Sequence, residues 1–116
     1  MSEEKKPSRL SRIELEVRMD EKNIPEQITW RATDADPGNH EATAMMVALW
    51  DHHTKNGMSI DLWTKQMTVP EMNIFFYQTL LSMSDSLKRS TQQQELSDDL
   101  MKFAKDFIAK ANRIAS

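Results

Sequence analysis

Hydrophobic and polar side chains alternate strictly near the start of the chain, from Arg12 to Met19. This period of two is typical of a strand that buries one face and exposes the other. A turn-forming cluster follows at residues 20–25, and a second alternation then runs to Thr33. The two alternating segments predict a long antiparallel hairpin. Its apolar positions are Ile13, Leu15, Val17, Met19, Ile28, Trp30 and Ala32.

The next apolar segment has a helical spacing. Residues 34–39 break the second strand, and Asn39 is a candidate helix cap. A helix of about three turns is predicted after it, ending before Asn56-Gly57. The apolar positions of this helix are Ala42, Met45, Met46, Leu49 and Trp50.

Alternation resumes from Met58 to Thr64 and predicts a third strand. Thr68, with Glu71 three positions later, forms a capping-box pattern in which each residue can bond the other's amide. Pro70 suits the first helical turn, because no hydrogen bond is lost there. A helix therefore follows this strand directly.

Two amphipathic helices are predicted in the last third of the chain, separated by the polar segment 88–94 and paired as a hairpin. The first has a continuous apolar stripe that Ile74, Tyr77 and Leu81 widen, which suggests burial on two sides, and the second has its apolar residues on one face. The first stripe contains Met72, Phe75, Phe76, Thr79, Leu80, Met83 and Leu87, and the second Leu96, Leu100, Phe103, Ala104, Phe107, Ile108 and Ala111.

These elements predict an α+β fold in the order ββαβαα. A three-stranded antiparallel sheet, with strand order 2-1-3, would carry the helices on one face. Residues 1–8 are expected to be a disordered polar tail, and residues 9–116 a single domain. The core-facing side of the sheet is predicted to hold Ile13, Leu15, Val17, Met19, Ile28, Trp30, Ile60 and Leu62.

Composition narrows the function classes. The chain has no cysteine, which excludes disulfides and thiol chemistry and suits the cytoplasm. A net charge of −3 disfavours a nucleic-acid partner, because phosphate binding needs a basic surface. No apolar run approaches membrane-spanning length, so we expect no membrane insertion.

Candidate catalytic chemistry is sparse. His40, His52 and His53 are the only metal-like cluster, but adjacent side chains of a helix point about 100° apart, and histidine also suits a helix C-terminus. Glu14 and Glu16 lie on the wet face of a strand, where charge pairing with neighbouring arginines is the ordinary explanation. No phosphate loop or nucleophile elbow is present. We expect no enzyme activity, no cofactor and no metal.

Trp63 points away from the apolar side of its own strand, which makes it a candidate contact for a partner. A partner-binding surface is predicted around Asp61, Trp63, Lys65 and Arg31. The alternative is a tryptophan packed over the aliphatic stems of neighbouring arginine or lysine residues. The other two tryptophans, Trp30 and Trp50, are expected in the core.

Several short segments resemble the gliding motility-associated protein GldC family of Bacteroidota. They are Ile24-Pro25-Glu26-Gln27-Ile28-Thr29-Trp30, Ala44-Met45-Met46-Val47-Ala48-Leu49-Trp50-Asp51, Ile60-Asp61-Leu62-Trp63-Thr64-Lys65-Gln66-Met67 and Phe75-Phe76-Tyr77-Gln78-Thr79-Leu80. The order and spacing of these segments cover the chain from about Arg12 to Phe107. The resemblance implies a small cytoplasmic accessory protein of gliding motility with no assigned reaction, cofactor or catalytic residue.

Two functions follow as expectations. The first is a non-enzymatic accessory protein that binds a protein of the gliding machinery, with homodimerisation through a sheet edge or outer face as a further arrangement. The second is a module that binds a small apolar ligand in a pocket lined by methionine and aromatic side chains. The candidate lining residues are Met45, Met46, Met83, Phe75 and Phe76.

Overall fold

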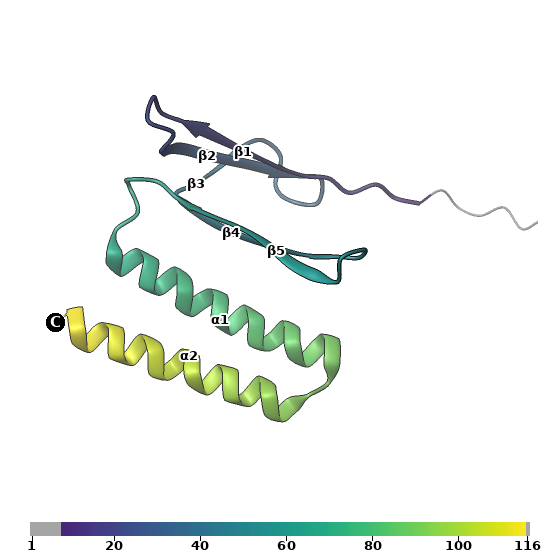
Figure 1. Ribbon diagram of the computed structural model, residues 1–116, viewed down its shortest axis with the longest axis vertical. Helices are drawn as coiled ribbons and strands as arrows, with labels where there is room; N and C mark the ends of the chain where they lie inside the picture. Colours follow the sequence, from purple (N-terminus) through teal and green to yellow (C-terminus); the bar gives the residue numbers. More distant parts are fainter. Residues whose placement is uncertain (1–7, 116) are drawn as a thin grey trace, which may run out of the picture. The chain divides into compact units, whose positions relative to one another are not determined.

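A computed structural model describes residues 8–115. The chain divides into two compact units, and the boundary between them in the sequence lies between Gln66 and Met67. Among the described residues, the first unit contains the strands and the second contains two helices (Figure 1). The predicted disordered tail lies, except for Ser8, outside the described residues. The prediction of a single domain over 9–116 stays a prediction.

The first unit begins with a three-stranded antiparallel sheet in the order β1-β2-β3. Its strands are β1 (Ile13–Met19), β2 (Pro25–Ala32) and β3 (His40–Ala42). The β1–β2 hairpin is confirmed, with Leu15 opposite Trp30. Ile28 of the central strand is fully buried, as the alternation predicts. Much of the predicted core face is open, however, since Ile13 is 75% exposed.

Asp20 organises the turn between β1 and β2. Its carboxylate accepts hydrogen bonds from the backbone amides of Lys22 and Ile24, at 2.8 and 3.0 Å. Asn23 adopts the left-handed conformation, with φ 61°, which asparagine tolerates better than most residues. The predicted turn cluster therefore works through side-chain to backbone hydrogen bonds.

The helix predicted over residues 42–50 is wrong. This segment is strand β4 (Ala44–Asp51), which pairs antiparallel with β5 (Asn56–Trp63) as a separate two-stranded sheet. Residues 44–50 are an uninterrupted apolar run, and such a run fits a helix stripe and a strand equally well by spacing alone. The pairing with β5 decides in favour of the strand.

The topology changes with that correction. The predicted third strand exists as β5, but its neighbour is β4 and not β1, so the strand order 2-1-3 is also wrong. The elements follow the order β1, β2, β3, β4, β5, α1, α2. The class α+β is confirmed.

Both predicted C-terminal helices are confirmed as α1 (Val69–Thr91) and α2 (Gln94–Ala115). The capping box is complete: the Glu71 amide donates to Thr68 Oγ1 at 3.2 Å, and the Thr68 amide donates to Glu71 Oε1 at 3.1 Å. The Thr68 hydroxyl also donates to Glu71 Oε1, at 2.8 Å. This bond, and then the one from the Thr68 amide, hold the pKa of Glu71 below its ordinary value, because both favour the ionised carboxylate. The helix begins where the sequence predicts.

Small residues bring α1 and α2 together side by side (Figure 1). Ser84 of α1 and Ser97 of α2 are buried and bonded reciprocally: Ser84 Oγ lies 2.7 Å from the Ser97 carbonyl, and Ser97 Oγ lies 2.8 Å from the Ser84 carbonyl. Ala104 is also fully buried. The two buried hydroxyls therefore satisfy their hydrogen bonds within the helical hairpin, which avoids the cost of an unpaired polar group.

Candidate interaction surface

The β4–β5 hairpin, residues 44–63, has two faces of different character. Its apolar face carries three cross-strand pairs made only of aliphatic and methionine side chains. Its second face, called here the two-tryptophan face, has a tryptophan near each end and polar side chains between them. The apolar face contains Met45, Val47, Leu49, Met58, Ile60 and Leu62; the two-tryptophan face contains Ala44, Met46, Ala48, Trp50, Gly57, Ser59, Asp61 and Trp63.

No residue of this hairpin is buried. Large apolar side chains on both faces are more than half exposed, which is unusual for strands rich in such residues. The fractions are 62% for Leu49, 68% for Trp50, 60% for Met58, 54% for Ile60 and 57% for Trp63.

Two of the predicted site residues lie together on the two-tryptophan face. Trp63 ends β5 opposite the small Ala44, and Asp61 lies two positions earlier opposite Met46. Because alternate residues of a strand share a face, Asp61 and Trp63 project from the same side. The structure therefore places these two residues on one face of β5, and their role in binding a partner stays a prediction.

The other two predicted residues make ion pairs elsewhere. Arg31 belongs to β2, in the three-stranded sheet, where its guanidinium contacts Glu14 of β1 at 2.7 Å. Lys65 follows β5, and its Nζ lies 3.8 Å from the Asp20 carboxylate in the β1–β2 turn. Arg31 therefore does not share a sheet with Trp63, and Lys65 joins the end of β5 to the other sheet.

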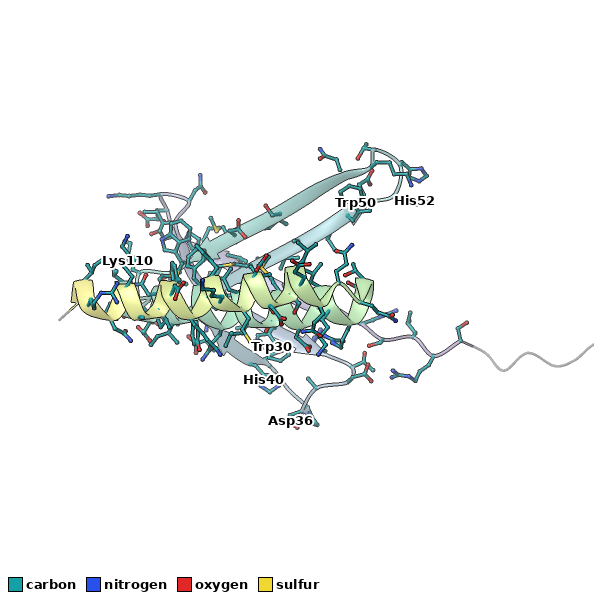
Figure 2. The ribbon with its side chains drawn as sticks, turned by 90° about the horizontal axis from the view of Figure 1, so that it is seen from below. Trp30, Asp36, His40, Trp50, His52 and Lys110 are labelled. Carbon is teal, nitrogen blue, oxygen red and sulfur yellow. The ribbon has the colours of Figure 1, made fainter. Side chains whose placement is uncertain are left out.

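Trp50 is the residue that sequence analysis missed. It was expected in the core, but it is 68% exposed and shares a face with Trp63. Figure 2 shows it near the far end of the hairpin, beside the turn that holds His52. If the apolar run had been interpreted as a strand, its period of two would have placed Trp50 on the opposite face from Val47 and Leu49. Trp30, by contrast, lies against His40, with ring centroids 4.6 Å apart.

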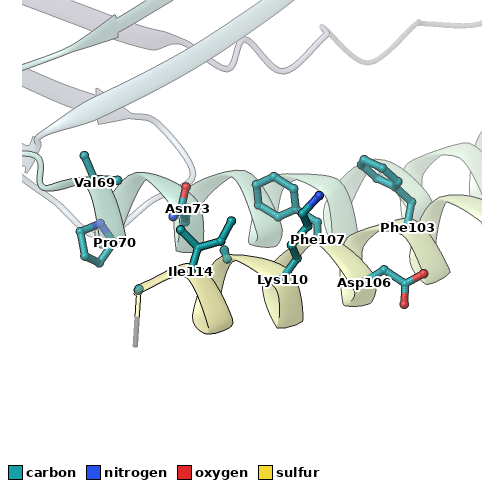
Figure 3. Close-up of a pocket in the computed structure, with 10 residues that line it drawn as sticks. Val69, Pro70, Asn73, Phe103, Asp106, Phe107, Lys110 and Ile114 are labelled. Atoms are coloured by element: carbon teal, nitrogen blue, oxygen red, sulfur yellow. The ribbon is translucent and has the colours of Figure 1, made fainter.

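The second unit has an open groove at the end where α1 begins and α2 finishes (Figure 3). Its volume is about 530 Å³. Apolar side chains make most of the lining, with Asp106 and Lys110 as its charged residues. None of the five residues proposed for a ligand pocket lines this groove. The lining residues are Val69, Pro70, Asn73, Phe103, Asp106, Phe107, Lys110, Ala111, Ile114 and Ala115.

A comparison with known protein families finds a family whose model matches most of the chain. The model of the family described as "Gliding motility-associated protein GldC-like" matches residues 25–113. The chain belongs to this family. The match begins with β2 and ends in the last turn of α2, so it includes the whole β4–β5 hairpin and all the residues that line the helical groove except Ile114 and Ala115. No curated protein and no solved structure matches the chain.

The expectation that His52 and His53 of this GldC-like chain lie at a helix C-terminus is wrong. His40 is in β3, and its Nε2 lies 2.9 Å from the Asp36 carbonyl. His52 and His53 are in the β4–β5 turn, with ring centroids 5.3 Å apart. Within residues 8–115 no group of three or more ligand-type side chains could hold a metal ion.

Asp51 shapes the same turn. Its carboxylate accepts hydrogen bonds from the backbone amide and the hydroxyl of Thr54, both at 2.7 Å. These bonds hold the pKa of Asp51 below its ordinary value, the amide contributing most. The hairpin therefore presents its tip in a defined conformation.

Neither of the two described helices is long and apolar enough to cross a membrane.

Proposed function

We propose that this GldC-like chain is a non-enzymatic cytoplasmic accessory protein of gliding motility that acts by binding another protein. The two-tryptophan face is the binding surface, with Trp63, Trp50 and Asp61 as its principal contacts. The observation that carries the proposal is the exposure of both tryptophans on one face of a hairpin that buries none of its residues.

Physical chemistry favours this surface over the rest of the sheet region. Tryptophan is enriched among residues that dominate binding energy, because it buries a large rigid area and retains one hydrogen-bond donor. Asp61 and Ser59 between the tryptophans supply polar groups that can fix the orientation of a partner. The combination of apolar anchors with a few polar contacts is typical of a specific protein interface.

Arg31 and Lys65 have a smaller part in the proposal than the sequence predicted. Arg31 already pairs with Glu14, and Lys65 pairs with Asp20. A partner that binds Arg31 or Lys65 would have to compete with the carboxylate that each already contacts. A partner that packs on the exposed tryptophans displaces only water. The surface is therefore centred on Trp63.

The test is affinity capture from a gliding bacterium that carries this protein, with quantitative mass spectrometry. Trp63→Ala and Trp50→Ala should each lose the proteins that the unchanged chain captures, because each removes an anchor from the same face. Arg31→Ala is the matched control from the other sheet and should retain them. Circular dichroism establishes that all three variants stay folded.

Capture of the same partners by folded Trp63→Ala and Trp50→Ala would overturn the proposed surface. Loss of capture by Arg31→Ala alone would move the surface to the three-stranded sheet. If a gliding strain that carries either tryptophan variant spreads normally while the deletion strain does not, the accessory role stands and the surface is wrong.

A second function is favoured by the groove between the helices. A volume of about 530 Å³ falls in the range of small-molecule sites, and its lining is mainly apolar. The ligand would be a small apolar molecule held against Phe103 and Phe107 (Figure 3). The fluorescent probe anilinonaphthalene sulfonate should bind the folded chain, and Phe107→Asp should abolish that binding. Absence of probe fluorescence with the unchanged folded chain would dismiss this function.

A further inference from the structure

The outer edge of β4 carries main-chain groups that have no partner among the described residues, because the two-stranded sheet contains only β4 and β5. The Thr64 amide donates to the Thr43 carbonyl at 2.9 Å, so residues 43 and 64 are a hydrogen-bonded pair. Hydrogen-bonded and non-hydrogen-bonded pairs alternate along an antiparallel ladder. Met45, Val47 and Leu49 therefore direct their main-chain groups toward β5. Those of Ala44, Met46, Ala48 and Trp50 point outward from the hairpin.

We infer that this edge pairs with β4 of a second copy of the chain, giving a four-stranded antiparallel sheet in which the two β4 strands are central. The two-fold axis passes through Val47. With this register Met46 lies opposite Ala48 of the second copy, and Ala44 lies opposite its Trp50. All four outward-facing residues are then in hydrogen-bonded pairs, and each such pair exchanges two main-chain hydrogen bonds.

The side chains fit this register in both size and charge. Across the two-tryptophan face, a row would run from Trp63 through Ala44 to Trp50 of the second copy and then its Gly57, so that large and small side chains alternate. On the apolar face, Val47 meets Val47, and Met45 meets Leu49. Asp51, the one charged residue of β4, lies opposite Thr43 of the second copy. No like charges oppose each other, and such pairs would destabilise a sheet.

The other long edges fit a second copy less well. On β1 the register that uses every outward group from Ile13 to Met19 would oppose Glu16 with Glu16, which is destabilising. On β5 the outward residues include Ser59 and Asp61, and polar or charged residues are typical of strands that remain at the edge of a sheet. Seven consecutive apolar residues, 44–50, are typical of a strand with neighbours on both sides.

This inference does not rest on the proposed function, and its first test needs no partner protein. The chain has no cysteine, so a single introduced cysteine reports contact between copies. Val47→Cys places two thiols across a non-hydrogen-bonded pair, where Cα atoms lie about 4.5 Å apart, within the range of a disulfide. Mild oxidation should convert this variant to a covalent dimer of 27 kDa, twice the 13.5 kDa of the chain.

Ile60→Cys is the matched control on the same face. In the proposed sheet the two copies of residue 60 are three strand spacings apart, roughly 14 Å, too far for a disulfide. Ile60 is 54% exposed, so random collisions would cross-link this control readily. Faster cross-linking of Val47→Cys supports β4 pairing. Equal rates, or faster cross-linking of Ile60→Cys, would overturn it, the latter in favour of β5.

A second pair of variants tests the main-chain hydrogen bonds. Ala48→Pro removes an outward amide that the β4–β5 ladder does not use, and proline is tolerated on edge strands. Light scattering should show this variant at 13.5 kDa, while the unchanged chain and the β5 control Ser59→Pro stay at 27 kDa, twice the chain mass. A monomeric unchanged chain, or a folded Ala48→Pro dimer, contradicts the inference. Both results are independent of whether Trp63→Ala loses its captured partners.

Discussion

The two sheets of the first unit distribute their side chains in opposite ways. In the three-stranded sheet, charged residues such as Glu14 and Arg31 occupy one face, and Ile28 on the other face is fully buried. The β4–β5 hairpin has an entirely apolar face and exposes a tryptophan near each end of the other. An isolated two-stranded hairpin is marginally stable in water. The comparison teaches that the first sheet has a buried residue at its centre, whereas the hairpin carries exposed apolar surface suited to association.

The largest expected difference between the sheets concerns their apolar side chains. Ile28→Ala should lower the free energy of unfolding by about 3 kcal/mol, because it opens a cavity around a fully buried residue. Ile60→Ala should cost less than about 1 kcal/mol, since much of its surface is already in water. Urea denaturation of both variants at a fixed protein concentration measures the contrast. Equal losses would mean that the hairpin has a buried centre as well.

The turns of the two sheets should respond alike to acid. The pKa of Asp20 is held below its ordinary value by backbone hydrogen bonds from Ile24 and then Lys22, with a smaller contribution from Lys65, and the pKa of Asp51 is lowered by Thr54. A lowered pKa in the folded state stabilises the fold at pH values above the ordinary aspartate pKa of about 3.9. That stability is lost as the pH falls below it.

Asp20→Asn and Asp51→Asn should therefore lower the melting temperature at pH 7, and each should flatten the acid limb of a plot of melting temperature against pH. Thermal unfolding followed by circular dichroism between pH 7 and acid measures both effects. An acid limb that is unchanged in either variant would show that its turn does not depend on the carboxylate.

The smallest expected effect concerns the charged face of the three-stranded sheet. Arg31→Ala breaks the pair with Glu14, but exposed ion pairs contribute at most about 1 kcal/mol and salt weakens them. The loss in free energy of unfolding should shrink further at high ionic strength. Urea denaturation with and without added salt checks this. A large, salt-independent loss would mean that Arg31 has a packing role.

Local signals in the sequence predicted most of the elements correctly. Thr68 and Glu71 act over three residues, so the start of α1 could be predicted without knowledge of the fold. Residues 44–50 could not be assigned in this way, because every position is apolar and the pattern has no period to separate strand from helix. Only pairing with β5, which depends on distant residues, makes this segment a strand.

The candidate surface shows the same limit. Asp61 and Trp63 share a strand, so alternation alone placed them on one face, and the structure agrees. Grouping them with Arg31 required a strand order, which periodicity does not supply. The exposure of Trp50 was missed for a related reason. A helix placed its side chain on the apolar face that packs into the core, whereas strand β4 places it on the exposed two-tryptophan face.

Within residues 8–115, three chain reversals place residues other than glycine in the left-handed backbone conformation: Asn23, Lys55 and Gln92. For lysine and glutamine this conformation costs roughly 1–2 kcal/mol of steric strain. Relative to glycine, however, a residue with a Cβ atom leaves the unfolded chain fewer backbone conformations. At each of these corners the unfolded ensemble is therefore narrower than a glycine would make it. The loss of chain entropy on closing each hairpin is correspondingly smaller.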